Sequence, residues 1–344
     1  MLELRAAVDR ILDQGRFRDA RWGVLAVSLD RGDTLLARAV DEPLLPASNL
    51  KLLTSAAALH HLGSGYRWTT WVLADGPVVD GVLEGDLILY GTGDPGISDR
   101  FHPHRYAPFQ ELARELTEGG IREVRGRVMG DGTFLTGPLL AEGWEAQDLN
   151  EWFAAPSGGL SFNENVVSIR IRPAAAGERP EVSTVPDHMG VLVANEARTV
   201  AGRAGRPLWL LRDDPSEPIR AVGELSVGGR DVWRQMTVRD PALAAAHAFT
   251  QVLREAGISV SGYPGSVAAG SSRLSRGRVW QPGDGPVVLA TFRSPPLAEY
   301  LTAVNGRSHN LYADLILKTL GRVVGEDGSF RGGGRVVERY AEAV

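Results

Sequence analysis

The sequence predicts a mixed α/β (α+β) fold in which helical segments toward both ends of the chain flank a long β-rich segment. Residues 48–62 have the pattern of an apolar helix, residues 67–293 contain mostly short β-like runs, and residues 295–321 have the pattern helix, loop, helix. The chain has 344 residues, 43% of them hydrophobic and 23% charged, which is typical of a globular protein with ample core. We expect two or three domains.

The amino-terminal region predicts a β-hairpin. Residues 22–30 and 34–39 form two β-like runs, and Arg31-Gly32-Asp33 lies between them. Gly and Asp are the residues that tight turns require, so this tripeptide is interpreted as a hairpin tip rather than as an adhesion motif.

The helix predicted at residues 48–62 is apolar on almost every side and ends at Gly63, so we expect it to be buried. Its first turn carries Ser48 and, three residues later, Lys51, one of only two lysines in the chain. This spacing puts both side chains on one helical face, as a serine acyl-transfer enzyme needs for its nucleophile and base. A single Ser-x-x-Lys is a weak signal and needs support from elsewhere in the chain.

The β-rich segment contains two patterns that suggest function but are better explained by structure. Gly91-Thr92-Gly93-Asp94-Pro95-Gly96 matches the dinucleotide fingerprint, yet no helix opens directly after it, so we predict a structural turn and no cofactor. Ser161-Phe162-Asn163 is interpreted as a turn closed by local hydrogen bonds. A helix is also predicted here, capped by Asp240, with Pro241 in its first turn and Gly257 at its end.

Near the carboxyl end, Ser308-His309-Asn310 lies in the predicted connection between two helices. This position makes it a better candidate for the second motif of a serine enzyme than the Ser-x-Asn at residue 161. The last residues, 335–344, have helical spacing.

Several classes of function and partner are disfavoured by composition. The net charge is −5 and there is no Lys/Arg-rich run, so nucleic acid is not an expected partner. The chain has no cysteine, no long apolar stretch typical of a transmembrane segment, and no signal peptide at its start. The pairs His60-His61 and His102/His104 lack further ligands at suitable spacing, so no metal site is predicted. The sequence does not predict an oligomeric state.

Four blocks of sequence resemble, in the same order, the class C low-molecular-mass penicillin-binding proteins, which are serine-type D-alanyl-D-alanine carboxypeptidases/endopeptidases. The blocks cover residues 46–54, 85–95, 160–165 and 294–311. This resemblance implies a transpeptidase/β-lactamase-like domain built from residues 1–66 and 294–344, with a large inserted β-rich part at 67–293. It also implies extracytoplasmic action, for example in the periplasm, on peptidoglycan peptides, and binding of β-lactams.

The resemblance further implies roles for individual residues. Ser48 would be the nucleophile and Lys51 its proton acceptor, while Ser308 and Asn310 would form the second motif. His309 stands where the family usually has Asp or a similar small polar residue. Trp144 and Asp148 lie in the stretch that matches the family's binding region for the stem-peptide amine, although Ala146 and Gln147 depart from that pattern.

The family's third motif, Lys-Thr/Ser-Gly, is not found in this sequence. Lys318 is followed by Thr319 and Leu320, and 34 residues follow Asn310. We therefore expect that the carboxy-terminal part of the catalytic domain is missing from this chain. The alternatives are a catalytically impaired peptidoglycan-binding protein of the same fold and, less favoured because of the long insert, a β-lactamase or related serine esterase.

Overall fold

The computed structural model describes residues 2–212, 218–274, 282–283 and 285–344. The chain divides into two compact units, Met1–Leu50 and Lys51–Val344. The domain boundaries predicted at residues 66/67 and 293/294 stay predictions, although strand β3 begins at Thr69 and strand β19 ends at Arg293.

The first unit is a helix with a β-hairpin, as the sequence predicts for residues 22–39. Ser28 donates its amide hydrogen to the Asp33 carbonyl (2.9 Å), and Gly32 at the tip adopts a φ of 71°. Arg38 donates to both Asp9 (2.8 Å) and Asp13 (2.6 Å), which fastens the helix to the second strand. The elements are α1 (Leu2–Leu12), η1 (Gly15–Phe17), β1 (Val24–Val27), β2 (Thr34–Arg38) and η2 (Ala47–Asn49).

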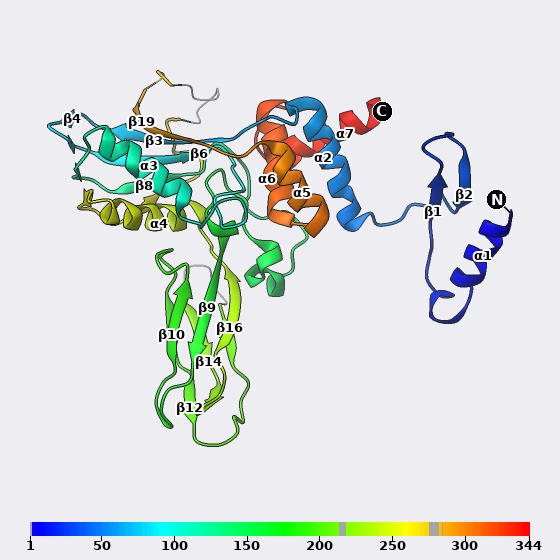
Figure 1. Cartoon of the computed structure of the whole chain (residues 1–344), viewed down its shortest axis with the longest axis horizontal. Helices are drawn as coiled ribbons and strands as arrows, with labels where there is room; N and C mark the ends of the chain where they lie inside the picture. The colour runs from blue at the N-terminus through cyan, green and yellow to red at the C-terminus, as the bar shows by residue number, and fades with distance from the viewer. Residues whose placement is uncertain (1, 213–217, 275–281, 284) are drawn as a thin grey trace. The chain divides into compact units, whose positions relative to one another are not determined.

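The second unit contains an α/β layer built on two sheets (Figure 1). The larger sheet has the order β18-β8-β6-β3-β19, and the smaller one has the order β17-β7-β5-β4. Helix α3 (Ala107–Glu118) packs against β19, and α4 (Pro241–Glu255) packs against β8 and β18. The strands are β3 (Thr69–Asp75), β4 (Val78–Val79), β5 (Val82–Leu83), β6 (Asp86–Gly91), β7 (Glu123–Val124), β8 (Val128–Asp131), β17 (Ser259–Val260), β18 (Gly265–Ser266) and β19 (Val287–Arg293).

The predicted start and end of α4 are confirmed. The Asp240 carboxylate accepts the Leu243 amide hydrogen (2.9 Å), which satisfies one of the free N–H groups at the helix start. Pro241 begins the helix, where its missing N–H costs nothing, and Gly257 just beyond the end has a φ of 85°.

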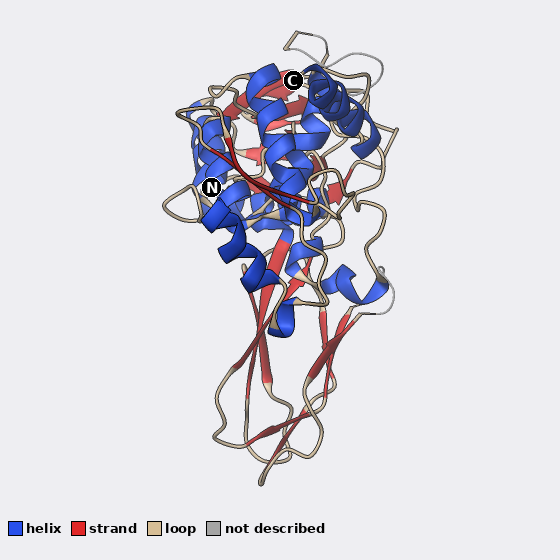
Figure 2. Ribbon diagram, turned by 90° about the vertical axis from the view of Figure 1, so that its right-hand side faces the viewer, coloured by secondary structure: helices blue, strands red, loops and turns tan. Residues whose placement is uncertain are grey.

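A β-arm extends from this layer (Figures 1 and 2). One of its sheets has the order β10-β9-β16, a second has the order β11-β14-β13, and β12 pairs with β15. The strands are β9 (Val166–Arg172), β10 (Glu181–Val185), β11 (Val193–Asn195), β12 (Arg198–Val200), β13 (Trp209–Leu211), β14 (Ile219–Val222), β15 (Glu224–Ser226) and β16 (Val232–Thr237).

The remaining helices form a cluster with its own apolar core, centred on large buried side chains such as Trp68, Tyr300 and Tyr312. They are α2 (Leu50–Leu62), α5 (Leu297–Arg307), α6 (Asn310–Val323) and α7 (Phe330–Ala343). The carboxy-terminal helical pattern predicted at 335–344 is thus part of a longer helix. None of the described helices is both long and apolar enough to cross a membrane.

The prediction that the first of these helices is buried is wrong for one of its faces. Only small side chains of α2 are fully buried, among them Ala57 and Ala58, whereas Leu52 and Leu59 are 59% and 43% exposed. Leu53 and Leu62 are partly buried against the core of the helical cluster, so the leucines of α2 are not all on its exposed side. An apolar sequence alone does not tell which sides of a helix will be covered.

Candidate active site

Three of the four predicted catalytic residues meet at the amino-terminal end of α2. The Lys51 ammonium (Nζ) donates hydrogen bonds to Ser308 Oγ at 3.2 Å and to Asn310 Oδ1 at 2.6 Å. More than 250 residues separate Lys51 from its two partners in the sequence. The fourth residue, Ser48, lies on η2 (Ala47–Asn49) in the first unit, three residues before Lys51 in the chain.

The short connection between α5 and α6 sets the positions of Ser308 and Asn310. Ser308 is the C-cap of α5 and has left-handed backbone angles (φ 57°, ψ 40°), a conformation that usually favours glycine. His309 is the N-cap of α6, and Asn310 is its first residue. A left-handed residue that is not glycine costs about 1 kcal/mol or more and persists only where its surroundings impose it. Here it turns the chain within two residues and leaves both motif side chains at Lys51.

The orientation of the Asn310 amide is defined by a contact on its other side. Asn310 Nδ2 donates to the Phe153 carbonyl at 2.8 Å, so Oδ1 is the atom that faces the Lys51 ammonium. Phe153 belongs to the short helix η4 (Trp152–Ala154). This segment thus holds the amide in the orientation that accepts a hydrogen bond from lysine.

Two lysines and one aspartate make up the electrostatic environment of the site. Half-burial lowers the pKa of Lys51, and the charge of Asp314 acts in the opposite direction. Burial raises the pKa of Asp314 to about 7, against the opposing charges of Lys318 and Lys51. Asn310, Asp314 and Lys318 follow one another at intervals of four residues along α6, so they lie on one helical face. A carboxyl group able to change its charge near neutral pH therefore lies one turn from the residue that binds Lys51.

Backbone carbonyl groups and an aromatic ring surround the Lys318 ammonium. Its ammonium donates to the Ser157 carbonyl (2.8 Å) and the Pro138 carbonyl (3.1 Å), and it lies over the Phe330 ring. Burial lowers its pKa to about 8. The following residue, Thr319, accepts a hydrogen bond from Trp68 Nε1 at 3.0 Å. Lys318 and Thr319 thus make contacts within the fold, and the absence of a third catalytic motif stays a prediction from the sequence.

His309, the middle residue of the second motif, contacts a partly buried carboxylate that the sequence did not mark as a site residue. Glu164 lies 3.2 Å from His309 Nε2, accepts from Tyr312 Oη at 2.7 Å, and receives two hydrogen bonds from Arg100 (2.6 and 3.1 Å). These partners hold the pKa of Glu164 well below its usual value even though burial acts to raise it. Glu164 has a φ of 56°, within a run of left-handed residues. The only signal in the sequence was its place inside the block at 160–165.

The same block contains the predicted turn, which is confirmed. Asn165 Nδ2 donates to Ser161 Oγ (3.0 Å) and to the Pro156 carbonyl (2.8 Å), and Asn163 Nδ2 donates to the Val166 carbonyl (2.6 Å). The short helix at this point is η5 (Asn163–Asn165). Ser161 and Asn163 are thus used for local structure.

The structure also shows a structural role for the glycine-rich stretch at 91–96. Asp94 Oδ1 accepts from the Gly96 amide and from Tyr300 Oη, both at 2.8 Å, and Asp94 is fully buried. A side chain on Gly91 would meet the Gly159 carbonyl at 2.5 Å, so glycine is required there by close backbone packing. The first described helix after this stretch is α3, which begins at Ala107.

The two residues predicted to bind substrate make different kinds of contact. The Trp144 ring packs against the Phe153 ring, with 5.7 Å between centroids, and so contacts the residue that orients Asn310. Asp148 lies on η3 (Ala146–Asn150), where its carboxylate accepts the Glu145 amide hydrogen at 3.3 Å. The structure therefore links Trp144 to the site through Phe153, and it gives Asp148 a capping contact.

A polar cavity of about 380 Å³ lies beside the second motif, lined by Arg100, Trp152, Glu164, Gln235 and His309 among others.

In the part of the chain that the structure describes, no three His, Asp or Glu side chains are arranged to hold a metal ion.

Comparison with known proteins shows relatives of one kind. The family described as D-Ala-D-Ala carboxypeptidase 3 (S13) matches residues 4–343. The D-alanyl-D-alanine carboxypeptidase of Actinomadura sp. (strain R39) is 31% identical over 342 residues, which cover 97% of this chain and 60% of the relative. D-alanyl-D-alanine carboxypeptidase DacB of Haemophilus influenzae is 28% identical over 122 residues, 36% of this chain and 24% of the relative.

Solved structures show the same fold. Penicillin binding protein 4 (dacB) from Haemophilus influenzae superposes with a TM-score of 0.77 at 21% identity, covering 98% of this chain and 70% of that one. The same protein in complex with a novel β-lactam gives a TM-score of 0.69 at 19% identity, covering 98% and 68%. The chain thus spans 60% of the length of the Actinomadura relative and about two thirds of these structures.

Proposed function

The chain belongs to the D-Ala-D-Ala carboxypeptidase 3 (S13) family, and we propose that it is a serine-type D-Ala-D-Ala carboxypeptidase/endopeptidase that acts on peptidoglycan stem peptides through an acyl-enzyme on Ser48. The observation that supports this most directly is the position of Lys51, whose amine is held between Ser308 and Asn310. A serine hydroxyl is a weak nucleophile until a base takes its proton, and burial moves lysine toward the neutral form that can do so.

In the proposed reaction the Ser48 hydroxyl attacks the carbonyl carbon of the penultimate D-Ala, and its proton passes to the neutral Lys51 amine. The lysine proton then passes through the Ser308 hydroxyl, 3.2 Å away, to the nitrogen of the departing D-Ala. The C–N bond breaks and an ester to Ser48 remains. Water hydrolyses this ester in a second step, with Lys51 again accepting the proton. A β-lactam would react in the same first step and form a longer-lived ester.

The other predicted residues have supporting roles in this proposal. Asn310, oriented by the Phe153 carbonyl, keeps the Lys51 amine directed and offers its amide to the substrate. The Ser48 N–H would donate to the developing oxyanion, where one fixed donor contributes roughly 10²- to 10³-fold in rate. We propose that Trp144 and Asp148 bind the stem-peptide side chain and that the protein acts outside the cytoplasm, as peptidoglycan is found there.

A labelled penicillin tests the proposal. The parent should become covalently labelled and lose the label slowly, whereas Ser48→Ala and Lys51→Met should not be labelled. Ser64→Ala, which replaces an exposed serine just beyond α2, is the matched control and should be labelled like the parent. Absence of labelling in the parent would instead support the impaired peptidoglycan-binding protein, and rapid hydrolysis of the drug would support a β-lactamase.

A further inference from the structure

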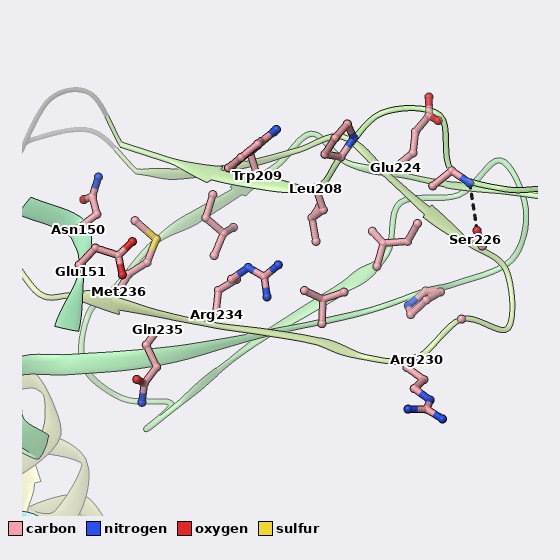
Figure 3. Close-up of a pocket in the computed structure, with 17 residues that line it drawn as sticks. Asn150, Glu151, Leu208, Trp209, Glu224, Ser226, Arg230, Arg234, Gln235 and Met236 are labelled. Carbon is pink, nitrogen blue, oxygen red and sulfur yellow. Dashed lines mark hydrogen bonds between the residues drawn. The ribbon is translucent and has the colours of Figure 1, made fainter. Parts of the chain in front are cut away.

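A second cavity, which the proposed reaction does not use, lies in the β-arm. It has a volume of about 580 Å³ and lies between β13 and β15 on one side and β16 on the other (Figure 3). We call it the arm groove and define it by Leu208, Trp209, Leu225, Val232, Arg234 and Met236. Most of these side chains are apolar, and Trp209, on the outer side of β13 in Figure 3, is 60% exposed.

The two sheets that border the arm groove each present an edge strand to it. Among the described strands, β16 pairs only with β9, and β13 pairs only with β14. An edge strand has backbone N–H and C=O groups on its outer side that no neighbouring strand satisfies. Such edges bind extended peptides through main-chain hydrogen bonds.

The arm groove also contains an arginine that has no carboxylate partner among the described residues. Arg234 projects from β16 into the space between the two layers (Figure 3). Within the described residues it has no carboxylate at ion-pair distance, and its one hydrogen bond goes to the Trp233 carbonyl (3.0 Å). Glu224, at the far end of the groove, is already occupied by Arg206 Nε and the Gly205 amide, both at 2.9 Å. A ligand carboxylate is the group that a free guanidinium binds best.

One end of the arm groove adjoins the segment that orients the catalytic cluster. Asn150 and Glu151 lie at this end, near Met236 (Figure 3). The next two residues contact the second motif, since the Trp152 ring packs on His309 and the Phe153 carbonyl binds Asn310. The groove and the cluster are therefore connected through four consecutive residues.

We propose that the arm groove binds a carboxylate-bearing peptidoglycan stem peptide in extended form, as a second binding site apart from the reacting centre. This inference rests on the proposed function for the identity of the peptide. The peptide's amides match the edges of β13 and β16 that no strand pairs with, its carboxylates match Arg234, and its aliphatic side chains match the apolar side chains that line the groove. A bare glycan strand offers only the lactyl carboxylates of its muramic acid residues and has no row of backbone amides for the strand edges, so we favour the peptide.

The test measures binding of a soluble disaccharide-tripeptide that lacks the terminal D-Ala residues and cannot be turned over. Isothermal titration is run on the full chain, before and after treatment with penicillin. We expect binding that persists after treatment and becomes about 10-fold weaker in Arg234→Gln, which is the size of one lost charged hydrogen bond. Trp209→Ala should weaken it as well. Arg230→Gln is the matched control, because Arg230 lies at the rim and points away in Figure 3.

Each outcome decides the proposal. Equal affinities for the parent and Arg234→Gln, equal losses in Arg234→Gln and Arg230→Gln, or equally tight binding of the disaccharide without its peptide would each overturn it. Penicillin labelling of the same variants separates the two hypotheses. If the parent is not labelled, the proposed function fails, whereas normal labelling with no Arg234-dependent binding refutes the arm groove alone.

Discussion

Replacing Asp314 by Asn should make acylation faster at alkaline pH while leaving it unchanged at acid pH. Above a pH of about 7 the Asp314 carboxyl is ionised, and its charge favours the protonated, inactive form of Lys51. The asparagine has nearly the same shape and carries no charge. The pKa of Lys51 should therefore fall in the variant, and more of the amine should be neutral and able to accept the Ser48 proton.

The size of this change in the acylation rate can be worked out from the distance between Lys51 and Asp314, which the geometry of α6 sets. Lys51 Nζ lies 2.6 Å from Asn310 Oδ1, and Asp314 follows Asn310 by about 6 Å along the α6 axis. If the charges of Lys51 and Asp314 are about 7 Å apart, they attract each other by about 2.4 kcal/mol at an effective dielectric constant of about 20. This attraction would raise the pKa of Lys51 by about 1.7. Because Lys51 is only half-buried, solvent screening reduces this to about one unit. Near pH 8 the variant should be acylated up to about 10-fold faster.

The assay is the second-order rate constant for labelling by a fluorescent penicillin, measured from pH 5 to pH 10. The rate profiles should coincide below about pH 6, where Asp314 is protonated in the parent, and should separate as the pH rises through 7. Asp19→Asn, an exposed aspartate of the first unit, is the control and should follow the parent. Identical profiles for Asp314→Asn and the parent, or slower labelling of the variant at pH 8, would refute the electrostatic argument.

Three further expectations follow from the same structure. The pKa of Asp314 is higher in the folded chain than its ordinary 3.8, so its contribution to the free energy of unfolding is full below about pH 4 and is lost as the pH rises through 7. Between pH 4 and pH 8 the parent should therefore lose up to about 4 kcal/mol of unfolding free energy through this group, and Asp314→Asn should not. Urea unfolding at the two pH values measures the difference. Glu164→Gln should destabilise the chain by about 3 kcal/mol at pH 7. The effect should become smaller as the pH falls below 4.5, the ordinary pKa of glutamate, because the pKa of Glu164 in the folded chain is lower than that value. The midpoint of thermal unfolding measures both effects. Gly91→Ala should cost about 2 kcal/mol or more, since its new methyl group meets the backbone of residues 159 and 160; an unchanged unfolding midpoint would contradict the packing.

Features set by residues close in sequence were predictable without the structure. The cap at Asp240 and the turn at Asn163 depend on side chains that bond within a few positions, and the structure confirms both. The Ser-x-x-Lys and Ser-x-Asn motifs were also visible, and the structure brings Lys51 to Ser308 and Asn310. Their catalytic roles stay a prediction.

Features set by contacts between distant segments were not predictable. Glu164 is separated from His309 by 145 residues, so nothing local distinguishes it from an ordinary surface glutamate. The exposed leucines of α2 were missed for a related reason, since periodicity shows that a helix is apolar but not which neighbours cover it. Asp314 is an intermediate case, because its four-residue spacing from Asn310 was a readable signal once the helix was assumed.

The two lysines of this chain lie in the same part of the fold, near Asp314. Arginine supplies 35 of the 37 basic residues, as only two are lysines, and a guanidinium does not give up its proton in proteins. Both lysines are electrostatically coupled to Asp314, and burial lowers the pKa of each. The only two lysine side chains of the sequence therefore lie near one carboxyl group, next to the second motif. In the proposed reaction proton transfer would pass through this cluster, because Lys51 donates hydrogen bonds to both Ser308 and Asn310 and burial shifts its pKa toward the neutral form.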